Sequence, residues 1–348
     1  MKKEISVIVV FTILLLSGCN TLTNKDIVVF PTFKKASLDE IDIPNILAMP
    51  VNLIVLNDKI IINDMRTDWI FKIFSKESFE FKGDLIRRGR GPMEEVEVSP
   101  YFRRYGDDAV LFQGLGTVKV ASLDYENGEL NLVVIDEFPL PVDMSNDNDF
   151  FLLNDKLYSS ITIPSTTRDF RCFDLKTHSN CEWGELLALQ RPKSLRPEDI
   201  FYLAKFTTVK PDQNKLAVVY QNLPILRIYC TKSARMLSQL HMADGSNNIK
   251  YFQRNSFEEG FLNYYWKIKS TEEFIYALYS GIVISGEGRN APDFASVIHI
   301  WKWDGTPVMK LELDRSIFSF DVTPDNKQLI ASSIVDVDNL FITEIPWD

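Results

Sequence analysis

Short hydrophobic runs separated by polar turns recur along most of the chain. In the stretch KPDQNKLAVVY, Lys210 to Tyr220, a Pro-Asp-Gln-Asn turn precedes an apolar run, and TPDNKQLIASS, Thr323 to Ser333, repeats this order. Proline presets φ in such a turn, while Asp and Asn side chains bond to the local backbone. An apolar run of this length after a turn predicts a β-strand. Apolar residues at helical spacing are scarce, so a fold of alternating strands and helices is disfavoured.

The same unit, a turn followed by strands, occurs six times. The first residue after each turn marks a unit, and the six markers are Lys59, Ala109, Lys156, Lys215, Phe274 and Lys327. Successive markers are 50, 47, 59, 59 and 53 residues apart. A period near fifty with about four strands per unit is typical of a β-propeller blade, for which roughly 40–50 residues is usual. The sequence therefore predicts an all-β fold, a six-bladed β-propeller with four-stranded blades.

The sixth unit lacks an outermost strand, because only Pro-Trp-Asp follows the strand predicted over Leu340 to Ile345. An open sheet edge invites aggregation, and propellers commonly close the last blade with a strand from the other terminus. Two N-terminal segments are placed to do this, Ile27 to Phe33 and Ala36 to Ile43. We favour the second because Pro31 would interrupt the first. Residues 36–348 are then a single propeller domain.

The N-terminus has the pattern of a bacterial lipoprotein signal. Lys2 and Lys3 precede an apolar stretch from Ile5 to Leu16, which leads into the sequence LSGC ending at Cys19. A spanning helix needs about 20 apolar residues, so this stretch is too short to cross a membrane comfortably. We expect a signal peptide over residues 1–18, lipid on Cys19 and a tether over residues 19–35. A cleaved secretory peptide followed by an incidental cysteine is the alternative.

Composition narrows the range of partners. The chain is 45% hydrophobic and 25% charged, the balance of an ordinary globular protein, and its formal net charge is -10. Nucleic acid binding needs a basic face, so we expect no nucleic acid partner. After Cys19 the remaining cysteines are Cys172, Cys181 and Cys230. We expect buried free thiols; a Cys172–Cys181 disulfide across a hairpin turning at Lys176 and Thr177 is the alternative.

The lipoprotein-type N-terminus, the repeated turns and the stretch RRGRGPMEEVEVSP, Arg87 to Pro100, together resemble a known group. The chain resembles the TolB-like six-bladed propeller lipoproteins of Gram-negative gut anaerobes. Gly89, Gly91 and Pro92 are also similar to the glycine-rich blade corner of NHL repeats, although Met93 stands where that corner has a third glycine. The resemblance implies a propeller held in the bacterial cell envelope, on the outer membrane facing the periplasm. It implies no particular activity.

Candidate binding residues lie in the long connectors between units, which in a propeller gather around the mouth of the central channel. The connector from Gly83 to Tyr105 is rich in arginine, and guanidinium groups capture carboxylates or anionic sugars. The connector from His241 to Asn263 and the residues after it are aromatic, and aromatic rings stack on sugars or peptide side chains. The candidates are Arg88, Arg90, Tyr101, Arg103, Tyr251, Arg254, Tyr264 and Trp266. The alternative interpretations are solvated or ion-paired arginines and aromatic packing between blades.

Catalytic and metal motifs find little support. The three histidines have no metal-ligand spacing, and no G-x-S-x-G motif occurs. The stretch DMSNDND, Asp143 to Asp149, places oxygen ligands at alternate positions but lacks the Gly and Glu of a calcium loop. We therefore expect neither a metal site nor a cofactor.

Three functional hypotheses follow from these observations. The first is a non-catalytic binding or assembly module for a glycan, a peptide or a partner protein. The second is a glycan-processing enzyme, a lyase or hydrolase, with its site at the channel mouth; residues from different blades would then assemble an active site that no local motif reveals. The third is a structural partner in an envelope complex. A deep pocket with perturbed titratable groups would favour the enzyme.

Overall fold

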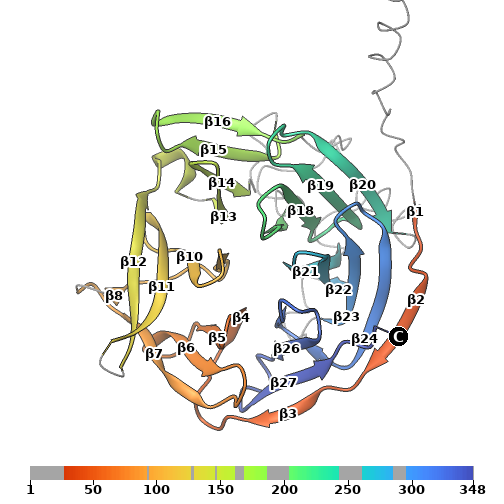
Figure 1. Cartoon of the computed structure of the whole chain (residues 1–348), viewed down its shortest axis with the longest axis horizontal. Coiled ribbons are helices and arrows are strands. Elements are labelled where there is room, and N and C mark those ends of the chain that lie inside the picture. Colours follow the sequence, from red (N-terminus) through yellow and green to blue (C-terminus); the bar gives the residue numbers. More distant parts are fainter. Residues whose placement is uncertain are drawn as a thin grey trace, which may run out of the picture.

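Six β-sheets stand around a central axis in the computed structural model of the chain (Figure 1). The structure describes residues 27–91, 94–126, 129–145, 147–160, 168–185, 204–242, 261–284 and 295–347. Within these ranges the helical structure is one 3-10 turn, η1, Val142–Met144. The predicted all-β fold and the predicted six-bladed propeller are therefore confirmed.

Each blade is a sheet of four antiparallel strands, numbered here from the channel outward. Blade 1 contains β4 Pro50–Leu56, β5 Lys59–Asp64, β6 Trp69–Ser75 and β7 Phe81–Arg88. Blade 2 contains β9 Arg103–Tyr105, β10 Ala109–Gln113, β11 Thr117–Glu126 and β12 Glu129–Pro139. Blade 3 contains β13 Asn148–Leu153, β14 Lys156–Ser160, β15 Phe170–Asp174 and β16 Ser179–Trp183. Blades 4 and 5 contain β17 Lys205–Val209, β18 Lys215–Tyr220, β19 Ile225–Cys230 and β20 Met236–Met242; and β21 Phe261–Ser270, β22 Phe274–Ile284, β23 Ala295–Lys302 and β24 Pro307–Ile317. Blade 6 contains β25 Ser319–Val322, β26 Gln328–Ser332, β27 Asn339–Glu344 and β3 Asp39–Asp42.

The turn chemistry read from the sequence positions the second strand of each blade. Five of the six markers are the first residue of that strand, and Lys327 lies directly before β26. In both copies of the repeated phrase an aspartate side chain accepts a backbone N–H two residues on, from Asn214 to Asp212 at 2.9 Å and from Lys327 to Asp325 at 3.2 Å. Gln213 and Asn326 both take positive φ. The two phrases thus build the same turn in blades 4 and 6.

Hydrophobic side chains fill each of the six junctions between neighbouring blades. One buried cluster joins blades 1 and 2, and five others join the successive pairs around the ring back to blade 1. Every residue of β4 is buried, whereas the outermost strand β3 is largely exposed. The apolar runs therefore lie near the axis, and the alternating polar strands lie at the rim.

The N-terminal segment wraps around three blades. β3 pairs antiparallel with β27, with Asp42 opposite Asn339, so the segment Ala36 to Ile43 closes the last blade as predicted. Two further strands add in parallel to the outer edges of other blades: β1, Ile27–Val28, pairs with β20, and β2, Thr32–Ala36, pairs with β24. The segment predicted as a tether thus contains two strands.

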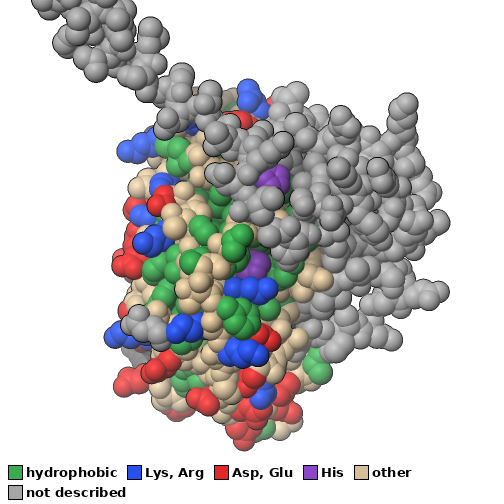
Figure 2. Space-filling model, turned by 90° about the vertical axis from the view of Figure 1, so that its right-hand side faces the viewer, with side chains coloured by type: hydrophobic (Ala, Val, Ile, Leu, Met, Phe, Trp, Pro, Cys, Tyr) green, Lys and Arg blue, Asp and Glu red, His purple; other side chains and the backbone are tan. Residues whose placement is uncertain are grey.

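The rim that carries this N-terminal segment is mixed in character. Figure 2 looks onto the side of the ring where β1 and β2 lie, and there hydrophobic side chains run along the middle while acidic side chains gather at one end.

A short strand also extends blade 1, where β8, Glu94–Glu95, pairs in parallel with β7. Pro92 and Met93 of the glycine-rich corner lie outside the described residues.

Cys172 and Cys181 form a disulfide in blade 3. They stand opposite each other on β15 and β16, so the hairpin register brings the two thiols together. The expectation that these cysteines are free thiols is therefore wrong, and the alternative is the observed state. Cys230 is free and partly exposed.

Candidate functional site

The central channel contains a cavity of about 240 Å³. All six innermost strands, β4, β9, β13, β17, β21 and β25, contribute to its wall. The cavity also reaches the turns that follow these strands, including Asn57, Asp107, Gln213, Glu272 and Pro324. Each innermost strand runs from a connector to such a turn, so the cavity extends toward the end of the channel opposite the connectors.

A first ion pair joins blades 2 and 3 across the channel wall. The Arg103 guanidinium bonds to the Asp149 carboxylate and, at 3.0 Å, to the hydroxyl oxygen of Thr207. That hydroxyl donates to Asp149 Oδ2 at 2.6 Å. Burial raises the pKa of Asp149, while Arg103 and Thr207 oppose the rise. The charge of Arg103 is therefore compensated by a carboxylate of the protein itself.

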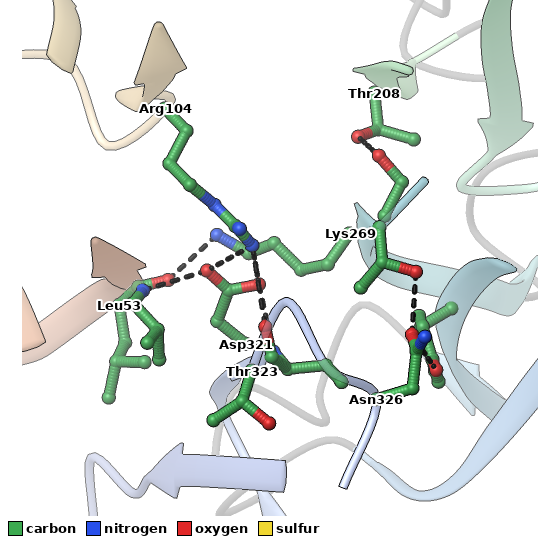
Figure 3. A network of polar contacts seen from close by, with 12 residues as sticks. Leu53, Arg104, Thr208, Lys269, Asp321, Thr323 and Asn326 are labelled. Atoms are coloured by element: carbon green, nitrogen blue, oxygen red, sulfur yellow. Dashed lines mark hydrogen bonds and ion pairs between the residues drawn. The ribbon is translucent and has the colours of Figure 1, made fainter. Parts of the chain in front are cut away.

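A second ion pair joins blades 2 and 6. Arg104 Nη2 lies 2.9 and 3.0 Å from the two carboxylate oxygens of Asp321, which also accepts the backbone N–H of Val55 at 2.8 Å (Figure 3). The Asp321 side chain is almost fully buried. This carboxylate thus fastens blades 1, 2 and 6 together.

Two lysines of β21 complete the charged lining. Lys269 Nζ donates to the Leu53 carbonyl at 2.7 Å and to Asn52 Oδ1 at 3.1 Å, both uncharged acceptors (Figure 3). Lys267 is only 9% exposed. Its ammonium lies 5.8 Å from the ring centres of Tyr101 and Phe318, and no described residue gives it a hydrogen bond or an ion pair.

Burial shifts the ionisation of this lining. It lowers the pKa of Lys267 to about 7, with the positive charge of Lys269 adding to the effect. Burial likewise lowers the pKa of Lys269 to about 8. It raises the pKa of Tyr101 to about 12, helped by the charge of Asp149. The cavity therefore holds a neutral phenol and two lysines that release protons more readily than lysine in water.

The predicted arginine site is divided by the structure. Arg103 and Tyr101 line the cavity. Arg88 instead ends β7, where its guanidinium donates to the carbonyls of Thr67 and Asp64, both at 2.9 Å. Arg90 is exposed and is not part of the cavity lining. The arginines of this connector thus do not form one patch.

The predicted aromatic site follows the packing alternative where it is described. Tyr264 is buried and belongs to the hydrophobic cluster between blades 4 and 5. Trp266 packs between blades, 5.5 Å from Phe318 and 6.3 Å from Phe206 between ring centres. Tyr251, Arg254 and the predicted lipidation site Cys19 lie outside the described residues.

Sequence reasoning missed Lys267, Lys269, Asp149 and Asp321, although a positional signal exists. The residue seven positions before the marker is Asn52, Asp149, Thr208 or Lys267 in blades 1, 3, 4 and 5, and all four line the cavity. A polar residue at this offset, inside an otherwise apolar innermost strand, therefore indicates the channel wall.

Metal coordination has no site among the described residues, because no three His, Cys, Asp or Glu side chains there are grouped closely enough. In the Asp143–Asp149 stretch, Asp147 accepts from Ser159 at 2.6 Å and faces Arg171, while Asp149 is paired with Arg103. The same part of the chain contains no helix long and apolar enough to cross a membrane.

Comparison with known proteins supports the architecture. The chain is similar in structure to a DUF4221 family member from Bacteroides vulgatus ATCC 8482, with 11% identity, 88% of this chain and 97% of that chain covered, and a TM-score of 0.53. It is also similar to a candidate exported protein from Bacteroides fragilis NCTC 9343, with 11% identity, 90% and 99% coverage, and a TM-score of 0.52. At this identity the similarity shows the fold. No curated protein sequence matches the chain.

Family membership comes from a sequence match. The family model described as "TolB-like 6-blade propeller-like" matches residues 30–325. This span takes in strands of all six blades. The chain therefore belongs to the TolB-like six-bladed propeller family.

Proposed function

We propose that this protein is a lipid-anchored component of the bacterial cell envelope that binds a ligand in its central channel without transforming it. The ligand is a group presented by a glycan, a peptide or a partner protein. The observation that carries this proposal is the channel cavity with its buried charged lining. Ligand sites are concave, with a few convergent polar groups fixing orientation, and this cavity fits that description.

The location rests on the N-terminal sequence. The basic start, the short apolar stretch and the LSGC motif before Cys19 support export and lipid attachment, with the propeller facing the periplasm from the outer membrane. Labelling cells with a radioactive fatty acid tests this directly. We expect label in the native protein and none in Cys19→Ser; equal labelling of both would contradict lipid attachment at this residue.

A binding screen tests the channel. We would probe arrays of glycans and peptides with the purified full-length protein and with Thr208→Trp, which places a large ring in the cavity wall. Thr177→Trp, in an exposed turn of blade 3, is the matched control. We expect binding to be lost in Thr208→Trp and kept in Thr177→Trp. Ligands that bind all three proteins equally would place the site outside the channel.

A glycan-processing enzyme is the second candidate, favoured by one observation. Tyr101, Lys267 and Lys269 all have shifted pKa values within one cavity, a feature that active sites often show. Incubating the protein with acidic glycans and following shortened or unsaturated products by mass spectrometry separates the two functions. Products that form with the native protein and not with Lys267→Met would support the enzyme.

A further inference from the structure

Lys267 is a buried cation that forms no ion pair with any described residue. It lines the cavity and is more than nine-tenths buried, yet its ammonium has no hydrogen bond or ion pair with any described residue and lies 5.8 Å from the ring centres of Tyr101 and Phe318. Burying a charge costs free energy unless the charge is paired, so an anionic group that binds beside it would offset that cost. The cavity beside the ammonium is where a compensating group would bind.

The charges of the channel do not balance. Arg103 is paired with Asp149 and Arg104 with Asp321, so these four side chains compensate one another. Lys269 has only uncharged acceptors for two of its three N–H donors. Lys210 and Glu272 also line the cavity and pair with each other at 2.8 Å, and the lining includes the exposed Asp107. With both lysines protonated, the described lining therefore has a surplus of one positive charge. From this surplus we infer that Lys267 and Lys269 form a subsite for an oxyanion, a carboxylate or phosphate group of the channel ligand.

This inference rests on the proposed channel binding and narrows it to one ligand class. Bonds between an ammonium and an oxyanion are among the stronger hydrogen bonds, and they strengthen further where water is excluded. A cavity of about 240 Å³ is several times larger than the space that one water needs. That space suits one acidic sugar unit or one acidic side chain. Arg103, the predicted arginine that lines the cavity, would not bind the anion, since its charge is already compensated by Asp149.

Binding of an anion here should depend on pH. The charged groups around Lys267 are Asp149 from β13 and Lys269 from its own strand. Near Lys269 lie Asp321 of β25 and both Arg104 and Arg103 of β9. Lys267 is partly deprotonated at neutral pH in the free channel, because burial holds its pKa near 7. An anion favours the protonated form, so binding takes up a proton above that pH. Affinity should then fall by up to about tenfold per pH unit above 7.

Titration calorimetry on the purified full-length protein tests the subsite. The probes are glucuronate, inorganic phosphate and, as the uncharged counterpart, glucose, each measured at about pH 6 and about pH 8.5, on either side of the Lys267 transition. Lys267→Met removes the charge, and Lys302→Met removes the same charge from an exposed position on β23. We expect the anions to bind more tightly at the lower pH. Lys267→Met should lose at least about tenfold in affinity, and Lys302→Met should match the native protein.

The outcomes are separable. Glucuronate binding alone identifies a carboxylate as the ligand group, and phosphate binding alone identifies a phosphate. Equal affinity in the native protein and Lys267→Met, or glucose binding as tight as glucuronate binding, would overturn the subsite. A glycan or peptide that Thr208→Trp rejects and Lys267→Met still binds would overturn the subsite and leave the channel function standing. If Thr208→Trp changes no binding, the channel function itself fails.

Discussion

Replacing Lys267 by methionine should stabilise the protein at neutral pH, because it removes a buried charge and keeps most of the side-chain volume. Folding lowers the pKa of Lys267 from 10.5 to about 7. Between these two pH values the unfolded chain therefore binds more protons at this residue than the folded chain does. A rise in pH then favours the folded state, and the cost of burying the ammonium disappears.

The size of the effect follows from the pKa change. Each pKa unit corresponds to 1.36 kcal/mol, so the protonated lysine destabilises the fold by about 5 kcal/mol well below pH 7. The side chain is only 9% exposed, so solvent screening reduces this figure little. The cost should be about 4 kcal/mol at pH 7 and about 2 kcal/mol at pH 9. The advantage of Lys267→Met should thus shrink by about 2 kcal/mol over this range.

Urea denaturation followed by tryptophan fluorescence measures this difference at both pH values. The native protein, Lys267→Met and the exposed control Lys302→Met are compared at each pH. Lys269 is present in all three proteins, so its titration differs between them only through its repulsion with Lys267. As the pH rises, we expect the free energy of unfolding of the native protein to approach that of Lys267→Met. Lys302→Met should change with pH as the native protein does. A stability difference between native protein and Lys267→Met that is the same at pH 7 and pH 9 would refute the reasoning.

Three further predictions concern the frame of the ring. Asp149→Asn leaves Arg103 buried beside a neutral amide and should lower the free energy of unfolding, measured by urea denaturation, by about 3–5 kcal/mol. Asp155→Asn, at an exposed ion pair, should lower it by less than about 1 kcal/mol. Similar losses in the two variants would count against the charge argument. Reducing the Cys172–Cys181 disulfide should destabilise the protein by about 3 kcal/mol, from the chain entropy of a closed loop this short, and a reductant that leaves the unfolding midpoint unchanged would contradict this. Deleting β1 to β3 exposes the edge of β27 and should cause aggregation seen by light scattering, while deleting β1 alone should not.

The fold could be predicted because local turn chemistry repeats. Proline, Asp and Asn at the turns fix where the second strand of each blade begins, and five strands begin at the predicted residue. The parallel strands β1 and β2 were not predicted in their places. Ile27 to Phe33 was considered only as the strand that closes blade 6, whereas β1 and β2 add to the outer edges of blades 4 and 5. The sequence placed Cys172 and Cys181 across a predicted hairpin but did not decide between free thiols and a disulfide, which the observed pairing of β15 with β16 does.

The candidate site was predicted less well, for a physical reason. Loops were expected to carry the binding groups, yet the charged groups lie on the innermost strands. A polar side chain is tolerated there because it faces the channel and displaces no hydrophobic contact between blades. Arg88 and Arg103 are equivalent in the sequence of one connector. In the structure, Arg88 donates hydrogen bonds to backbone carbonyls of blade 1, whereas Arg103 pairs with a carboxylate in blade 3. Such partners lie far apart in sequence, so a single chain read alone does not reveal them.

The closing strand has a consequence for how the protein is made. The backbone N–H of Asn45 bonds to the Asp338 carboxylate 293 positions away, next to the pairing of β3 with β27. Synthesis adds about 5–20 residues per second, so the first segment made waits tens of seconds for the last. During that delay β3 lacks its partner strand and stays open to other chains. Chaperones that shield nascent strands should therefore matter most for this protein before β27, Asn339–Glu344, emerges.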